Sequence, residues 1–401
     1  MCGSKKIGKI LSLTPTPLCD AYIPKNKLNI CQKRYPLDLF LCSDCNYVFI
    51  PYVVSPEEVY REYIYVTTSS MGLSEHFKSY AENLLKKVRL SQNSLVVDIG
   101  SNDGTLLKYF KKQKMKTLGI EPATAIAKKA NNSGIKTIPK FFSPKLADVI
   151  INNYGSASIV TMNNLFANID NLQDLAKGIA KLLSSDGVLV IESSYLADMI
   201  NNMVFDFIYH EHLSYLSVKP IVSFFRRFKM EVFDIEHTTT KGGSLRYYIQ
   251  LANGPKNIST SVNKLIEYEE SIHLYDRNIY KNFAQKISNR KRELLKKLHE
   301  LKGKDITIIG YGGSATSTTL IYHFEIGQEM DFIVDDNQSK HYTYSPGYHI
   351  PILPSGEIYK IKPDYIIVLA WRYFDVILKK HQKYLDQGGH FIVPLPNFYI
   401  I

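Results

Sequence analysis

The chain has 401 residues, of which 45% are hydrophobic and 22% are charged. This composition is typical of a folded protein of two or three domains and excludes a largely disordered chain. Lysine and arginine outnumber the acidic residues by 49 to 38, which gives a formal net charge of +11. No segment approaches the roughly 20 apolar residues that a membrane-spanning helix needs, so membrane insertion is not expected.

The positive charge is densest between Arg290 and Lys304. We interpret this run as the solvated face of a helix, with an anionic partner such as nucleotide phosphates as the alternative. The basic residues are not interleaved with aromatic residues as in single-strand binders, so no nucleic-acid partner is predicted. Near the N-terminus, Pro15 and Pro17 interrupt a short apolar segment and no small-residue cleavage site follows, so we do not expect secretion.

All five cysteines lie in the first 45 residues, at positions Cys2, Cys19, Cys31, Cys42 and Cys45. An odd number in a long chain makes a disulfide scaffold a poor explanation, which favours metal binding in a reducing cytoplasm. The C-x-x-C spacing of Cys42 and Cys45 lets two thiolates reach one tetrahedral zinc ion, and Cys2-Gly3 is similar to the end of a second such pair. We predict zinc at Cys2, Cys42 and Cys45. The fourth ligand stays open between Cys31, Cys19 and a start further upstream, and buried free thiols without zinc are the alternative.

Hydrophobic periodicity predicts an α/β protein in chain order. Residues 1–68 are expected to be an irregular cysteine-bearing module, and residues 56–90 carry helical spacing. Strands are expected at 95–99, 116–120, 158–162 and 188–192, and helices at 105–114, 123–131 and 172–183. Residues 204–250 are expected to be less regular, and 264–302 to form a long helix. A second alternation has strands at 305–309, 330–334, 365–370 and 390–393 and a helix at 315–323. This order implies two parallel sheets.

The first strand-to-helix turn reads Asp98-Ile99-Gly100-Ser101-Asn102-Asp103-Gly104. Its spacing resembles motif I of the Rossmann-like methyltransferases that bind S-adenosylmethionine (SAM), and differs from the dinucleotide fingerprint. Glu121 ends the next strand, where its carboxylate can accept hydrogen bonds from a ribose diol. We predict that SAM is held by Asp98, Gly100, Asn102, Gly104, Glu121 and Asn164. A generic βα turn is the alternative.

The second turn, Gly310-Tyr311-Gly312-Gly313-Ser314-Ala315, has Asp335 twenty residues further on. The spacing fits an NAD fingerprint, but any phosphate-bearing nucleotide can use the same helix N-terminus. Two nucleotide turns in one chain indicate a methyl donor and a nucleotide-linked substrate. The competing interpretation is a dehydrogenase with NAD in the second half.

Five further motifs occur: Phe205-Asp206-Phe207-Ile208-Tyr209-His210-Glu211-His212-Leu213-Ser214-Tyr215, Gly242-Gly243-Ser244-Leu245-Arg246, Asp335-Asp336-Asn337, Pro346-Gly347-Tyr348-His349-Ile350-Pro351-Ile352 and Leu369-Ala370-Trp371-Arg372-Tyr373. With these motifs nearly the whole chain resembles the nucleotide-sugar C-methyltransferases, which add a branch methyl to a deoxy-keto sugar. The resemblance implies an N-terminal zinc-binding module (1–68), a central Rossmann-like SAM methyltransferase domain (69–265) and a C-terminal Rossmann-like domain that holds the nucleotide (266–401). We expect a cytoplasmic monomer or homodimer.

Two positions depart from the family pattern: Asn168 and Lys241 stand where the family usually has histidine. Both positions lie near the family's substrate pocket, and neither side chain is an imidazole base. The resemblance implies that the substrate is bound by Asn168, Lys241, Arg246, Gly312, Ser314, Asp335 and Trp371. Arg246 has an open alternative, a structural salt bridge in place of a phosphate contact.

Methylation at carbon requires a base that removes a proton beside a ketone and a group that stabilises the enolate oxygen. By resemblance His212 is the base, Glu211 assists or orients it, Tyr209 binds the sugar and Tyr65 is an upstream active-site tyrosine. A histidine beside a carboxylate is a plausible base on chemical grounds alone. The alternative is that His210, Glu211 and His212 only satisfy a buried loop.

Three other functions remain open from the sequence. An O-methyltransferase of the same fold could act on a sugar or a polysaccharide precursor. An NAD-dependent oxidoreductase would use the second turn and leave the first unexplained. A catalytically silent module would bind its ligands without turnover.

Overall fold

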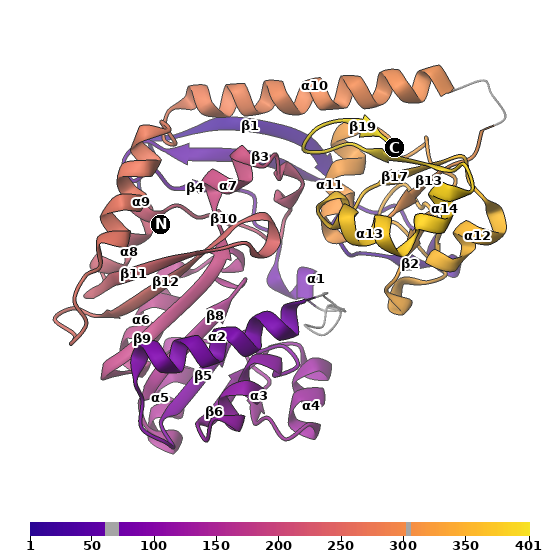
Figure 1. Ribbon diagram of the computed structural model, residues 1–401. Coiled ribbons are helices and arrows are strands. Elements are labelled where there is room, and N and C mark those ends of the chain that lie inside the picture. The colour runs from indigo at the N-terminus through magenta and orange to yellow at the C-terminus, as the bar shows by residue number, and fades with distance from the viewer. Residues whose placement is uncertain (61–71, 302–305) are drawn as a thin grey trace.

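The computed structural model describes residues 1–60, 72–301 and 306–401. In this part of the chain an N-terminal antiparallel sheet, a central seven-stranded sheet and a C-terminal six-stranded sheet form three units (Figure 1). The two larger sheets carry helices and are mainly parallel, which confirms the predicted α/β class. No described helix combines the length and the apolar character that crossing a bilayer requires.

The N-terminal module is more regular than the sequence predicted. Its sheet has the order β1-β3-β4-β10, with β1 (Ile7–Thr16), β3 (Tyr35–Cys42), β4 (Val48–Phe49) and β10 (Ser214–Tyr215). Leucines at alternate positions of β1 and β3 are buried, because a strand turns every second side chain to the same face. The expectation of an irregular module was therefore wrong: the prolines follow or interrupt short strands without preventing them.

The N-terminal module also pairs with both α/β units. Strand β10 lies far along the chain, in the segment after the central sheet's fifth parallel strand, and pairs with β4. Strand β2 (Ile23–Pro24) pairs with β15 (Thr343–Tyr344) of the C-terminal unit. Helix α1 (Pro56–Tyr60) follows the module.

The central unit is built on a sheet with the order β11-β12-β9-β8-β5-β6-β7. Its strands are β5 (Leu95–Ile99), β6 (Lys116–Ile120), β7 (Thr137–Ile138), β8 (Ala157–Asn163), β9 (Leu183–Ser194), β11 (Met230–Thr238) and β12 (Ser244–Leu251). Its helices are α2 (Leu73–Val88), α3 (Thr105–Lys112), α4 (Thr124–Asn132), α5 (Pro144–Tyr154), α6 (Leu172–Leu182), α7 (Leu196–Asn201) and α8 (Val218–Arg226). The antiparallel β11–β12 hairpin corrects the expectation that residues 204–250 are less regular.

Two helices connect the central and C-terminal units. The predicted long helix is interrupted, because α9 (Thr260–Ser271) ends before α10 (Arg277–Leu301) begins. Helix α10 runs along the top of the molecule in Figure 1 and passes over β1. One face of α10 is buried, with Tyr280, Phe283 and Ile287 among its core residues, and the other carries basic side chains to the surface.

The C-terminal unit has the strand order β16-β14-β13-β17-β18-β19, parallel except for β19. Its strands are β13 (Ile308–Tyr311), β14 (Ile333–Asp335), β16 (Ile352–Pro354), β17 (Tyr365–Val368), β18 (His390–Val393) and β19 (Tyr399–Ile400). Its helices are α11 (Ala315–Phe324), α12 (Ile358–Ile361), α13 (Phe374–Lys380) and α14 (Gln382–Asp386). Both predicted strand–turn–helix segments thus exist, and each turn lies at the carboxyl edge of its sheet.

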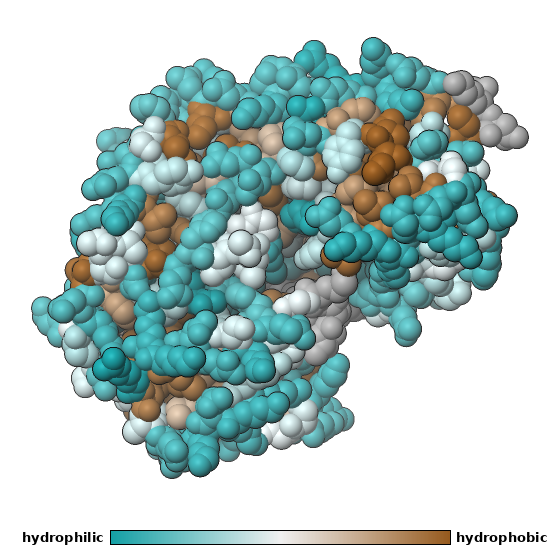
Figure 2. Space-filling model, in the orientation of Figure 1, coloured by the Kyte–Doolittle hydropathy of each residue, from teal (hydrophilic) through white to brown (hydrophobic). Residues whose placement is uncertain are grey.

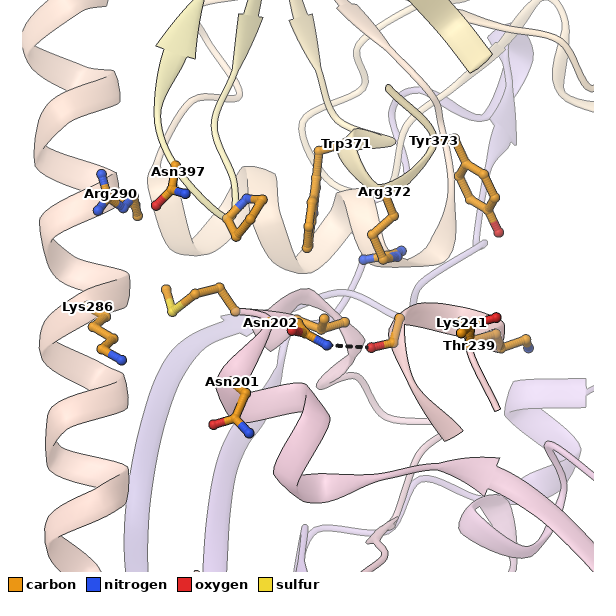
Figure 3. Close-up of a pocket in the computed structure, with 14 residues that line it drawn as sticks. Asn201, Asn202, Thr239, Lys241, Lys286, Arg290, Trp371, Arg372, Tyr373 and Asn397 are labelled. Atoms are coloured by element: carbon orange, nitrogen blue, oxygen red, sulfur yellow. Dashed lines mark hydrogen bonds between the residues drawn. The ribbon is translucent and has the colours of Figure 1, made fainter. Parts of the chain in front are cut away.

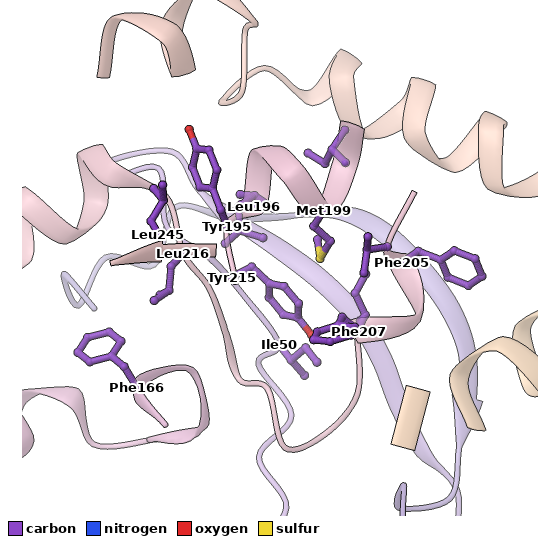
Figure 4. Close-up of a cluster of buried hydrophobic side chains, with 14 of the residues drawn as sticks. Ile50, Phe166, Tyr195, Leu196, Met199, Phe205, Phe207, Tyr215, Leu216 and Leu245 are labelled. Atoms are coloured by element: carbon purple, nitrogen blue, oxygen red, sulfur yellow. The ribbon is translucent and has the colours of Figure 1, made fainter. Parts of the chain in front are cut away.

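A buried hydrophobic cluster lies where the N-terminal module meets the central unit (Figure 4). Ile50, Phe166, Tyr195, Phe205 and Tyr215 belong to it, and the last two lie at the ends of the 205–215 loop. Burying such side chains stabilises the fold by about 1.5–3 kcal/mol each. The loop that carries residues 205–215 is therefore fixed at several points, which gives the side chains it presents a defined position.

Candidate active site

A cavity of about 710 Å³ lies between the central and C-terminal units. Its described lining comes from the carboxyl ends of β5, β6 and β8, from the 205–215 loop and from the turn after β13. Strand β5 lies between β8 and β6, so the chain order reverses at this edge. Ligands of open α/β sheets bind at such switch points. Figure 2 shows hydrophilic surface on both units and a hollow where they meet.

The turn after β5 has the backbone that close approach to a ligand requires. Gly100 has φ +75°, and a Cβ there would lie 2.8 Å from Leu165 Cδ2. Gly104 has φ +76°, and its missing Cβ leaves room for Ile135. Gly100 and Asn102 line the cavity, whereas Gly104 shapes the turn without facing it. Glycine is thus required at both positions for different reasons.

Two buried acidic residues face the cavity beside this turn. Glu121 accepts hydrogen bonds from the backbone N–H groups of Asn102 (3.0 Å) and Ala123 (2.9 Å), which fixes its orientation. Thr161 donates to Asp98 Oδ1 at 2.7 Å. Burial, together with the charge of Glu121, raises the pKa of Asp98 to about 7. A carboxylate has about four acceptor positions, so Glu121 keeps capacity for a ribose diol.

The end of β8 contributes a residue that sequence reasoning missed. Both amide atoms of Asn163 are buried without a hydrogen-bond partner among the described residues, and the side chain lines the cavity. Buried polar groups are rarely left unpaired, so this amide fits the polar groups of SAM. Asn164, which was predicted, lines the same wall at φ +53°, and Asn168 lies in the lining nearby. The sequence signal was the pair of asparagines, because Asn163 directly precedes the predicted Asn164.

His212 lies in the cavity with a defined tautomer. Its Nδ1 is 3.0 Å from the carbonyl oxygen of Phe207, so Nδ1 carries the proton and Nε2 keeps its lone pair. Burial, and then the charge of Lys241, lowers the pKa of His212 to about 4. The imidazole is therefore neutral at neutral pH and able to accept a proton. Tyr209 packs against it in a tilted arrangement, with ring centroids 4.1 Å apart, and also lines the cavity.

Glu211 is placed differently from the expectation that it orients His212. The Phe207 carbonyl takes that role, and no hydrogen bond joins Glu211 to His212 in the described chain. Glu211 instead lies in the charged part of the cavity with Asp20, Lys241 and Lys340. Burial, and then the charge of Asp20, raises the pKa of Glu211 to about 8, so its carboxyl group is largely protonated at neutral pH.

His210 and Tyr65 are the other two residues that the sequence analysis considered for the active site. His210 Nε2 contacts the backbone carbonyls of Tyr35 (3.3 Å) and Pro36 (3.2 Å), so this histidine joins the N-terminal module to the loop. It corresponds to the buried-loop alternative and leaves His212 as the histidine that faces the cavity. Tyr65 lies outside the described residues.

The turn after β13 forms the opposite wall of the cavity. Ser314 and Asp335 line it, whereas Gly312 (φ +99°) lies behind them against Ala370. The backbone N–H of Gly313 donates to Asp335 Oδ2 at 2.6 Å, and Ser314 and Ser317 form a capping box at the start of α11. Side chains of the protein thus satisfy the amides that would otherwise bind phosphate. Asp20 and Lys340, which pair at 2.8 Å across 320 residues of sequence, complete this wall.

Three predicted substrate residues lie in different surroundings. Lys241 (φ +54°) lines the cavity and also a second cleft. Trp371 faces only the second cleft, and its Nε1 donates to Asp206 Oδ2 at 3.0 Å. Arg246 is outside the cavity lining: it is buried and binds Glu192, with Nε and Nη2 at 2.8 Å and 2.7 Å. This geometry corrects the phosphate role and agrees with the structural alternative.

Three of the five cysteines meet. The sulfur atoms of Cys2, Cys42 and Cys45 all lie within 4.8 Å of one another, and those of Cys2 and Cys42 are 3.6 Å apart. Tetrahedral zinc–thiolate bonds of about 2.3 Å place sulfurs about 3.8 Å apart, so these thiols fit three ligands of a zinc ion. Cys19 and Cys31 do not belong to this cluster, so neither supplies the fourth ligand here.

Comparison with known proteins agrees with this architecture. Three family models cover successive segments: “Putative zinc binding domain” matches residues 1–60, “Methyltransferase domain” 73–233 and “C-methyltransferase C-terminal domain” 239–396. The C-methyltransferase NovU of Streptomyces niveus is 27% identical over 99% of this chain and 95% of its own length. Together these matches support a SAM-dependent C-methyltransferase. This assignment selects carbon methylation over the O-methyltransferase and oxidoreductase alternatives.

The solved structures reported below match this chain over less than half of its length. A SAM-dependent methyltransferase from Clostridium acetobutylicum is 12% identical, with a TM-score of 0.37 over 49% of this chain and 96% of its own. The magnesium protoporphyrin IX methyltransferase of Synechocystis, with bound SAM, is 12% identical, with a TM-score of 0.34 over 45% and 79%.

Proposed function

We propose that this C-methyltransferase methylates the carbon beside the ketone of a nucleotide-linked keto sugar, as a step in the synthesis of a surface polysaccharide or its sugar precursors. The observation that carries the proposal is a single cavity that the SAM turn, His212 and the C-terminal unit all line. A sugar there can reach the methyl donor and the base together, which the effective concentration of bound reactants favours. SAM, when bound, supplies the electrophilic methyl group on sulfur.

His212 is the proposed base. Its Nε2 takes the proton from the carbon beside the ketone, and the electron pair of that C–H bond forms the enolate double bond. The Phe207 carbonyl holds the Nδ1 proton and then stabilises the imidazolium that forms. SAM held by the turn after β5 and Glu121 would supply its methyl group to the enolate carbon, and its sulfur would keep the electron pair of the broken bond.

Glu211 and Lys241 are the proposed stabilisers of the enolate oxygen. A neutral Glu211 can donate a hydrogen bond to this oxygen, and the charge of Lys241 acts in the same cavity. Donors and charges in a water-poor cavity stabilise developing negative charge more strongly than they do in water. Tyr209, beside His212, is the proposed contact for the sugar hydroxyls.

The experiment offers methyl-labelled SAM with a panel of nucleotide-linked 4-keto sugars and locates the label by NMR. We expect a new carbon–carbon bond beside the ketone. Exchange of the substrate C–H with deuterium, measured with S-adenosylhomocysteine (SAH) bound, tests the base separately. His212→Gln should lose exchange and methyl transfer, whereas His237→Gln, outside the cavity lining, should keep both. A label on oxygen, or full exchange in His212→Gln, would contradict the proposal.

A further inference from the structure

A second cleft of about 650 Å³ adjoins the methyl-transfer cavity. It lies between three elements: the end of α7 and the 239–242 turn of the central unit, helix α10, and residues 371–373 with 396–397 of the C-terminal unit (Figure 3). Lys241, Arg372 and Tyr373 line both the cleft and the cavity, so they form the wall that the two share. A ligand that passes this wall would occupy both spaces.

The charged residues that line this cleft are all basic. Lys241, Lys286, Arg290 and Arg372 line it, and none of its described lining residues is acidic. Lys286 and Arg290 are four residues apart on α10, so both side chains leave the same face of the helix. We call the surface formed by these four residues the basic cleft. Figure 3 shows Lys286 and Arg290 coming from α10 at one side and Arg372 coming from the C-terminal unit.

Acidic neighbours neutralise only part of this charge. Arg372 binds Asp206, with Nη1 2.9 Å and 2.8 Å from the two carboxylate oxygens, and Arg290 pairs with Glu293 on its own helix. Lys286 forms no ion pair with any residue that the structure describes. The remaining excess of positive charge suits an anion, and the side-chain amide of Asn397 lies in the same lining as a neutral donor.

The alternative site for the phosphates, the turn after β13, is less suited to them. Asp335 and the capping serines already bind its amides, and Asp20 and Asp335 add carboxylates to that wall. A diphosphate placed there would lose amide donors and meet carboxylates. In the basic cleft it would instead meet guanidinium and ammonium groups, which form the stronger charge-assisted hydrogen bonds.

We propose that the nucleoside diphosphate of the substrate lies in the basic cleft, with its sugar reaching past Lys241 and Arg372 into the methyl-transfer cavity. This inference rests on the proposed nucleotide-linked substrate and names the site of its phosphates. Tyr373, on the shared wall and 42% exposed, offers an aromatic face to the ligand. The basic face of α10 is then partly a binding surface as well as a solvated one.

The test measures binding of UDP and dTDP by calorimetry to the full chain and to charge-reversal variants. Lys286→Glu with Arg290→Glu should weaken binding of the nucleoside diphosphate at least about tenfold, since two charge-assisted contacts are replaced by repulsion. Arg292→Glu with Lys296→Glu makes the same charge change on exposed positions of α10 outside the cleft, and should keep the affinity within about twofold. SAH affinity should stay unchanged in both, which verifies the fold.

The outcomes separate the two proposals. If wild type binds UDP or dTDP and the Lys286/Arg290 variant binds it equally well, the cleft assignment is overturned and the proposed function stands. If the wild type binds neither nucleotide, both the cleft assignment and the proposed function are contradicted. The neutral pair Lys286→Gln with Arg290→Gln should give an intermediate loss, and an unchanged affinity there would also overturn the assignment.

Discussion

Asp206 joins the central and C-terminal units through a buried carboxylate, and its substitution gives the sharpest test of the interface. The side chain has no solvent exposure, and it accepts from Arg372 Nη1 and Trp371 Nε1 at 2.8–3.0 Å. In Asp206→Asn the Arg372 side chain, itself only 13% exposed, loses its counter-charge. Breaking a buried ion pair in this way costs about 3–5 kcal/mol, so we expect the free energy of unfolding to fall by that amount.

The assay is urea unfolding followed by tryptophan fluorescence. Trp371 is the single tryptophan of the chain, so the signal comes from a direct partner of Asp206. Removing both charges should restore most of the stability, because a buried pair is often replaceable by apolar groups. We therefore expect Asp206→Asn with Arg372→Met to be more stable than Asp206→Asn alone. A loss below about 1 kcal/mol in the single variant would refute the reasoning.

Three further predictions concern the cofactor turn, the acid–base groups and the metal. In Gly100→Ala the alanine must adopt φ +75° at a cost of about 1–2 kcal/mol and displaces Leu165, so SAH affinity should fall. Gly134→Ala, at φ +79° on the surface, should lose similar stability and keep its SAH affinity. The methyl-transfer rate should fall above about pH 8 as Glu211 loses its proton, and below about pH 4 as His212 gains one. In Glu211→Gln the rate should stay flat across pH 8, unlike that of the wild type. Cys42→Ser should lower the zinc content measured by mass spectrometry, whereas Cys31→Ser should not; equal zinc in both would contradict the three-thiol site.

The local parts of the fold were readable from the sequence. Strands at 95–99, 116–120 and 390–393 occur as predicted, because buried strands followed by turn residues leave a local signal. The β11–β12 hairpin was missed since β12 is buried on both faces and shows no alternation. The strands of the N-terminal module were missed because their prolines were given more weight than their alternating leucines.

The candidate site was predictable only where its residues follow a turn or a motif. Gly100, Glu121 and His212 were found in this way. Lys340 and Asp20 were missed because their pairing spans 320 residues and leaves no local pattern. Arg246 was placed in the predicted pocket because it belongs to a motif, and this placement was wrong. Its partner across the β12–β9 ladder is Glu192, and that carboxylate binds it.

The pairing of β2 with β15 has a consequence for synthesis on the ribosome. Strand β2 is made among the first 24 residues, but its partner begins at Thr343, after most of the chain has been translated. Until then the β2 edge has unpaired backbone groups, which invite association with other nascent chains. The N-terminal module is therefore completed only when the C-terminal unit has been synthesised. A chain terminated before residue 343 would be left with an open, aggregation-prone edge.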